Sequence, residues 1–211
     1  MTAIWTEFIP SIPNVPFCPG PGVTLATMQV DGTPLDGVLV LTPEPHRDDR
    51  GLFTRTFDAQ DASAAGIDPT SFVQESQSRS FQGVVRGMHG RVGSGEAKLV
   101  RVAHGAVLDV VVDARPQSPT FGRVATFLLD DEDFRVVYIP RGFLHGHQTL
   151  TATADVCYKI DAPHDPSQDV AVHHLDADLA IAWPQPVTLV SARDAAAGTW
   201  AELARRLTAT G

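Results

Sequence analysis

Short apolar runs, separated by turn-forming residues, dominate the chain from Leu35 onward. They are rich in valine, phenylalanine and threonine, residue types that favour β-strands. The runs are GVLVLTP, GLFTRTF, SFVQESQSRS, GVVRGMHG, AKLVRVAHG, AVLDVVVDA, FGRVATFLL, FRVVYIP, GFLHGHQTL and ADVCYKI. No βαβ alternation accompanies them, so the pattern predicts ten strands in an all-β sandwich or barrel.

The two ends of the chain differ from this pattern. Residues 1–34 include the stretch IPNVPFCPGPG, where proline and glycine are too frequent for a helix or a central strand. We expect an N-terminal arm over residues 1–34 and a single domain over residues 35–211. Near the C-terminus, Ser191 precedes a stretch with Trp200, Leu203 and Leu207 at helical spacing, which predicts one short closing helix.

Composition and charge narrow the class of protein. The chain is 43% hydrophobic and 19% charged, an ordinary globular balance, and its formal net charge of -9 argues against a nucleic-acid partner. Only Cys18 and Cys157 are present, without the spacing of a zinc or redox motif. No apolar run of membrane-spanning length and no export signal is visible. We therefore expect a cytoplasmic protein with no membrane partner.

Histidines on several predicted strands raise the question of a metal centre. Metal-binding jelly rolls usually supply two histidines two positions apart and a carboxylate, yet His89 is followed by Gly90 and Arg91. His145 and His147 lie two apart but lack a dense set of further ligands. Because metals require a defined ligand number and geometry, we expect no metal and favour acid–base chemistry. Taken alone, however, a single histidine such as His89 is more often structural.

Seven segments then occur in a specific order. They are HRDDRGLFTRTF, SFVQESQSRS, GVVRGMHG, AKLVRVAHGAVLDVVVDARPQSPTFG, IPRGFLHGH, CYKI and AWP...SARDAAA, over about residues 46–197. This series resembles the dTDP-4-dehydrorhamnose 3,5-epimerase family. The resemblance implies a cupin-type jelly roll without metal or cofactor, acting as a homodimer on a thymidine-diphosphate 4-keto-6-deoxy sugar.

The resemblance also implies catalytic roles for four residues. His89 of the RGxH segment is the base, and Asp194 of the SARD segment pairs with it. Tyr158 of the YK pair is the general acid, and Lys98 of AKLVR helps to hold negative charge on the ketone oxygen. These roles fit the chemistry, because a proton beside a ketone leaves only when a base and an electrostatic partner for the enolate flank the ring.

Five further residues are candidate substrate contacts. The guanidinium groups of Arg50 and Arg86 suit diphosphate oxygens, and the amide of Gln74 suits thymine or sugar hydroxyls. His145 either supports the base, touches the substrate or has a buried structural role. His164 occupies a position where the family usually has a tyrosine that packs beside the sugar.

Each assignment has a structural alternative. Asp194 also falls at the third position of a helix capped by Ser191, where a carboxylate favours the helix dipole. Tyr158 could pack in the core, and Gln74 could make only a cross-strand hydrogen bond. Lysine, arginine and histidine side chains are ordinarily solvated, although Lys98 is one of only two lysines in the chain.

Several positions depart from the family pattern. Gly90 and Arg91 follow the RGxH histidine where an aromatic residue is usual, which alters a wall of the pocket. Ser76 replaces an asparagine, Arg55 an acidic residue, and His164 a second tyrosine. We therefore expect a specialised member of an antibiotic-type deoxysugar pathway, acting at C3, C5 or both.

Three other functions compete with this prediction. A ketoisomerase of the same fold is one, but the SPTFG, YK and SxRD segments argue against it. A catalytically silent nucleotide-sugar-binding protein is another, although the candidate base and acid are both present. The third is a metal-dependent cupin.

Overall fold

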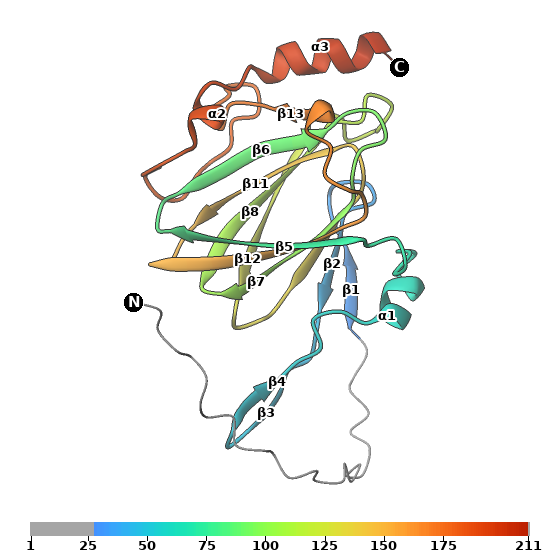
Figure 1. Cartoon of the computed structure of the whole chain (residues 1–211), viewed down its shortest axis with the longest axis vertical. Helices are drawn as coiled ribbons and strands as arrows, with labels where there is room; N and C mark the ends of the chain where they lie inside the picture. The colour runs from blue at the N-terminus through green and yellow to red at the C-terminus, as the bar shows by residue number, and fades with distance from the viewer. Residues whose placement is uncertain (1–27, 211) are drawn as a thin grey trace, which may run out of the picture.

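Two antiparallel β-sheets form most of the computed structural model, which describes residues 28–210. The six-stranded sheet has the order β1 (Gln29–Gly32), β2 (Leu39–Thr42), β10 (Val136–Ile139), β7 (Lys98–His104), β12 (Thr153–Ile160) and β5 (Gln74–Phe81). The five-stranded sheet has the order β13 (Asp169–Ala171), β6 (Val85–Arg91), β11 (Phe143–Thr149), β8 (Ala106–Asp113) and β9 (Val124–Asp130). Figure 1 shows β6, β11 and β8 stacked over β5, β12 and β7, the two-sheet arrangement expected of a jelly roll.

The predicted strands are confirmed, since each of the ten apolar runs contains a strand. The sequence pattern missed β1, β3 (His46–Asp48) and β13, as well as the helix α1 (Ala59–Ala64). The predicted arm lies largely outside the described residues, but its residues Gln29–Gly32 form β1 at the edge of a sheet. A short 3-10 turn, η1 (Pro166–Gln168), precedes β13.

The chain ends in the short closing helix that the sequence predicted, and a separate four-residue helix precedes it. The helix α2 (Ala192–Ala195) begins at Ser191, whose hydroxyl accepts from the backbone N–H of Asp194 at 3.1 Å. A second helix, α3 (Trp200–Thr210), begins where Thr199 and Glu202 each accept a hydrogen bond from the other's backbone N–H. This capping box starts a new helix and separates it from α2.

The core lies on both faces of the five-stranded sheet. Val107 and Val111 of β8 point between the sheets, where they pack with the main buried cluster. Val110 and Val112 point to the outer face and pack with Trp200 of α3, which covers that face in Figure 1. Burial on both sides explains why this strand is almost continuously apolar in sequence.

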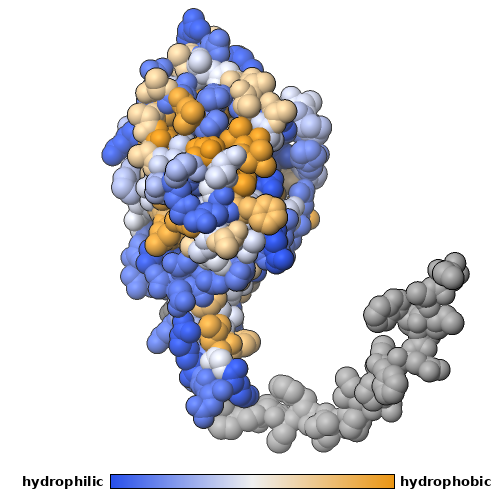
Figure 2. Space-filling view, turned by 90° about the vertical axis from the view of Figure 1, so that its left-hand side faces the viewer, coloured by the Kyte–Doolittle hydropathy of each residue, from blue (hydrophilic) through white to orange (hydrophobic). Residues whose placement is uncertain are grey.

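A two-stranded hairpin projects from the main body. It consists of β3 and β4 (Gly51–Phe53), which pair only with each other. Figures 1 and 2 show it as a narrow extension at the opposite end of the molecule from α3, with hydrophobic side chains on its surface. Over residues 28–210, no helix is long and apolar enough to cross a membrane.

Candidate active site

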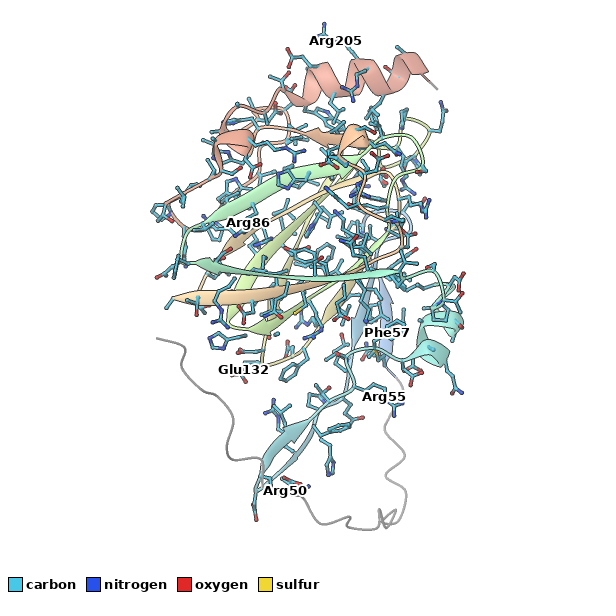
Figure 3. The ribbon with its side chains drawn as sticks, viewed as in Figure 1. Arg50, Arg55, Phe57, Arg86, Glu132 and Arg205 are labelled. Atoms are coloured by element: carbon cyan, nitrogen blue, oxygen red, sulfur yellow. The ribbon has the colours of Figure 1, made fainter. Side chains whose placement is uncertain are left out.

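A cavity of about 540 Å³ lies between the two sheets. Figure 3 shows Arg86, one of its lining residues, between β6 and β5. The six-stranded sheet contributes one wall, the five-stranded sheet the facing wall, and the segment that leads into α2 closes one side. The lining residues are Ser76, Ser78, Val84, Val85, Arg86, His89, Lys98, His145, His147, Tyr158, Ile160, Leu189, Val190, Ser191, Arg193 and Asp194.

His89 and Asp194 meet at the wall of this cavity. His89 Nε2 lies 2.6 Å from Asp194 Oδ1, and the carboxylate is buried while the imidazole is partly exposed. Asp194 also stands in the first turn of α2, so the structural and the catalytic interpretations of this residue are compatible. A buried carboxylate against one ring nitrogen orients an imidazole and stabilises its protonated form, as a catalytic base requires.

A β-bulge brings Arg86 and His89 to the same face of β6. In the pairing with β11, His145 lies opposite His89 and His147 opposite Arg86, so three steps along β6 match two along β11. In a regular strand, residues three apart point to opposite faces. Gly87 lies within the bulge at φ 134, and a Cβ there would approach Gly146 Cα to 2.6 Å. The close approach of the two strands at the bulge therefore requires glycine at position 87.

Tyr158 and Lys98 occupy the facing wall. The hydroxyl of Tyr158 lies 3.4 Å from Ser78 Oγ, and burial raises the pKa of Tyr158 to about 12. Lys98 Nζ forms an ion pair with Glu96 Oε1 at 2.9 Å. The cavity therefore places His89 of one sheet, paired with Asp194 of α2, opposite a protonated tyrosine and a lysine of the other sheet.

His145, which lines the cavity, belongs to a second histidine–aspartate pair. His145 Nε2 is 2.6 Å from Asp109 Oδ1, and both side chains are buried. The neighbouring His147 is completely buried, burial lowers its pKa to about 3, and its Nε2 has no hydrogen-bond partner. Asp109 was missed from the sequence, although its charge in the middle of the apolar run AVLDVVVDA was a visible signal. Within residues 28–210, no group of three or more potential ligands could hold a metal ion.

Three predicted contact residues are not among the residues that line this cavity. Arg50 stands at the tip of the hairpin, far below the sheets in Figure 3, and forms an ion pair with Asp48. Gln74 donates to Ser76 Oγ at 3.3 Å. His164 Nδ1 lies 2.8 Å from Arg91 Nη2. Arg86 and His145, in contrast, line the cavity.

We expected the departures from the family pattern to alter the pocket, but not all of them lie at the cavity. Ser76 lines the cavity, whereas Arg55 contacts Asp58 at the start of α1, 2.5 Å away. Gly90 does not alter a cavity wall, because its side-chain direction points at the Phe143 carbonyl and Leu144 on the outer face of the sheet. Residue 90 therefore cannot reshape the pocket directly.

Comparisons with known proteins agree with this fold. The family model described as dTDP-4-dehydrorhamnose 3,5-epimerase matches residues 32–202. The Escherichia coli (strain K12) protein dTDP-4-dehydrorhamnose 3,5-epimerase is 39% identical over 180 residues, which span 84% of this chain and 97% of the relative.

Two solved structures come from Streptomyces. NovW, a 4-keto-6-deoxy sugar epimerase from the novobiocin biosynthetic gene cluster of Streptomyces spheroides, aligns with a TM-score of 0.82 and 38% identity over 90% of this chain and 96% of its own. ChmJ, a 3'-monoepimerase from Streptomyces bikiniensis in complex with dTDP-quinovose, aligns with a TM-score of 0.76 and 35% identity over 83% and 89%. The chain described here belongs to the dTDP-4-dehydrorhamnose 3,5-epimerase family.

Proposed function

We propose that this chain is an epimerase that inverts C3, C5 or both of a dTDP-4-keto-6-deoxyhexose. The observation that carries the proposal is the contact of 2.6 Å between His89 and Asp194 at a cavity whose facing wall holds Tyr158. The family supports the substrate class, since a relative of the same fold binds dTDP-quinovose.

Proton removal is the first step. Neutral His89 takes the proton from the carbon beside the ketone, and buried Asp194 stabilises the imidazolium that results. The electrons of the broken C–H bond move to the ketone oxygen, where the ammonium group of Lys98 offsets the developing charge. His89 and Lys98 come from different sheets, so a sugar ring between them contacts both groups.

Return of a proton from the other face completes the inversion. Tyr158 lies in the wall opposite His89, and its raised pKa of about 12 keeps the hydroxyl protonated at neutral pH. The enolate carbon takes the tyrosine proton, the tyrosinate regains one from solvent, and the His89 imidazolium releases its proton to solvent. Because removal and return use different residues, each step has its own mutant phenotype.

The diphosphate contacts lead to a second part of the proposal, a homodimer. Arg86 presents its guanidinium at the cavity, anchored through Nε to Ser80 Oγ at 2.8 Å. Arg50 lies on the projecting hairpin and cannot reach the cavity of its own chain without rearrangement. We infer that the hairpin extends to a second copy, whose cavity Arg50 completes.

The pathway and the compartment follow as further parts of the proposal. NovW belongs to an antibiotic gene cluster, which supports a specialised deoxysugar pathway for this chain as well. Cys157 is free and buried, which is compatible with the reducing cytoplasm. We therefore place the reaction among cytoplasmic steps that modify nucleotide sugars.

Incubation with dTDP-4-keto-6-deoxyglucose in heavy water tests the proposed activity. We expect deuterium at C3, C5 or both, with inversion at the labelled carbon, read by NMR. Label at one carbon alone identifies a monoepimerase. Absence of exchange with wild-type protein refutes the activity, and near-normal exchange with His89→Asn refutes the assigned base.

A further inference from the structure

A chain of ion pairs leads from Lys98 in the cavity to side chains behind the cavity wall. Lys98 Nζ lies 2.9 Å from Glu96 Oε1, and Glu96 Oε2 lies 2.8 Å from Arg91 Nη1. Asp169 contacts Arg91 at 3.3 Å and Arg193 at 3.0 Å. Lys98 and Arg193 line the cavity, whereas Glu96 and Arg91 lie outside its lining. The ion pairs therefore connect the wall that carries Lys98 to helix α2.

The first three members of this chain are unusually well buried for charged residues. The exposed fraction of the side chain is 7% for Arg91, 9% for Glu96 and 13% for Lys98. Removing charges from water costs free energy that their mutual attraction repays incompletely, so buried ion pairs contribute little to net stability. Stability is thus a weak explanation for these buried ion pairs. Because they begin at Lys98 in the cavity, they indicate a role in the reaction.

These ion pairs suit a lysine whose ammonium group must be in position before the reaction begins. Lys98 is the first residue of β7, and a free lysine side chain has considerable rotamer entropy to lose when it is held in one position. A positive group stabilises an enolate best when it is already held at the oxygen's position. The carboxylate of Glu96 forms an ion pair with the ammonium group, and Arg91 offsets the charge of Glu96. Two cations and one anion leave a net charge of +1 beside the cavity.

Arg91 is itself held by the loop that follows β12. It donates to the carbonyl of Pro163 at 2.8 Å and lies 2.8 Å from His164 Nδ1. Through Arg91, the loop that carries His164 is therefore connected to the ion pairs that end at Lys98.

We propose that Glu96 is the positioning residue for Lys98, and that Arg91 holds Glu96 in the required place. The inference rests on the proposed function, because Lys98 acts in it as the partner of the enolate oxygen. Glu96 does not line the cavity, so it acts through Lys98 and not by touching the sugar.

Glu96→Gln tests this role by removing the charge while keeping the shape. We expect kcat for deuterium exchange to fall about tenfold or more, because small misplacements of a catalytic group are costly, while KM changes less than about threefold. The chain offers a matched control in Glu75→Gln, since Glu75 pairs with the other lysine, Lys159, at 3.0 Å. The control should leave kcat and KM within about twofold of wild type.

A spectroscopic measurement separates this inference from the proposed function. The chain has only two lysines, so lysine labelled with carbon-13 at Cε gives two assignable NMR signals. Glu96→Gln should displace the Lys98 signal and leave that of Lys159, and Glu75→Gln should do the reverse. An unmoved Lys98 signal, or a kcat within about twofold of wild type in folded Glu96→Gln, overturns the inference. A wild-type protein without turnover refutes the function, while the NMR result still decides whether Glu96 holds Lys98.

Discussion

His147 is the side chain whose ionisation the fold changes most clearly. Its pKa falls from the ordinary 6.5 to about 3, chiefly because burial penalises the imidazolium, with His145, Arg86 and His89 adding repulsion. Between these two values the unfolded chain binds more protons at this residue than the folded chain. Stability therefore decreases as the pH falls through this range, by up to about 1.4 kcal/mol per pH unit.

Replacing the imidazole should remove this pH dependence. Between about pH 7.5 and about pH 5, the free energy of unfolding should decrease in both proteins. We expect the decrease in His147→Leu to be smaller than that in wild type by roughly 2 kcal/mol. Urea unfolding at both values measures the difference. An equal decrease in the free energy of unfolding of wild type and His147→Leu would contradict the lowered pKa of His147.

Tyr158 acts only in the second half of the proposed reaction. Tyr158→Phe removes the hydroxyl and keeps the ring, so proton removal by His89 should continue while inversion falls by about 100-fold or more. Deuterium exchange and product stereochemistry, followed in the same reaction, separate the two steps. Ser78→Ala serves as a control, because it removes only the neighbour at 3.4 Å and should retain inversion. Parallel loss of exchange and inversion would rule out Tyr158 as the acid.

At the scale of the element, the packing of β6 against β11 determines where His89 stands. A Cβ at Gly90 would lie 2.7 Å from the Phe143 carbonyl oxygen and 2.8 Å from Leu144 Cδ2, so an alanine must push the strands apart. We expect Gly90→Ala to cost about 1–3 kcal/mol of stability and to lower kcat by shifting His89. Thermal unfolding and exchange rates measure both effects.

The edge strand β1 supplies the control for this substitution. A Cβ at Gly32 would meet nothing within 4 Å, so Gly32→Ala should leave stability and activity almost unchanged. A Gly90→Ala protein as stable and active as Gly32→Ala would show that β6 tolerates the extra atom. The aromatic residue usual in the family should be tolerated still less at position 90, because it adds further volume against β11.

The strands also show which parts of the fold could be predicted from the sequence. Long runs such as AVLDVVVDA predicted strands correctly, because burial leaves a regular apolar pattern in them. The missed strands β3 and β13 have three residues each, and β1 is exposed throughout, so none of them carries such a pattern. The family motifs could be recognised in the sequence. The bulge in β6 could not be predicted from it, because a bulge depends on the register against another strand.

For the candidate site, too, some features could be inferred from the sequence and others could not. The pairing of His89 with Asp194 followed from the family resemblance, since no local pattern links residues 105 positions apart. Arg91 and His164 were recognised as departures, but their contact depends on the loop after β12 lying beside β6. Sequence therefore named the candidate reacting groups, while the supporting contacts behind them required the three-dimensional structure.

At the scale of the whole molecule, the hairpin is the feature that a single chain does not explain. It pairs with no other strand of the described chain, and Leu52 and Phe53 expose 43% and 60% of their surface. Figure 2 shows it standing clear of the main body. An apolar projection that carries a candidate diphosphate ligand, Arg50, is suited to a contact with a second copy.

Subunit complementation tests this arrangement most directly. Arg50→Ala lacks the phosphate contact and His89→Asn lacks the base, so each pure variant should be impaired. In a mixed dimer, the cavity with intact His89 receives intact Arg50 from the other chain, and its site becomes complete. Refolding the two together at equal amounts should restore roughly a quarter of the wild-type sites, since half of the dimers are mixed and each has one intact site. Activity that stays at the average of the two pure variants would mean that Arg50 does not serve a neighbouring cavity.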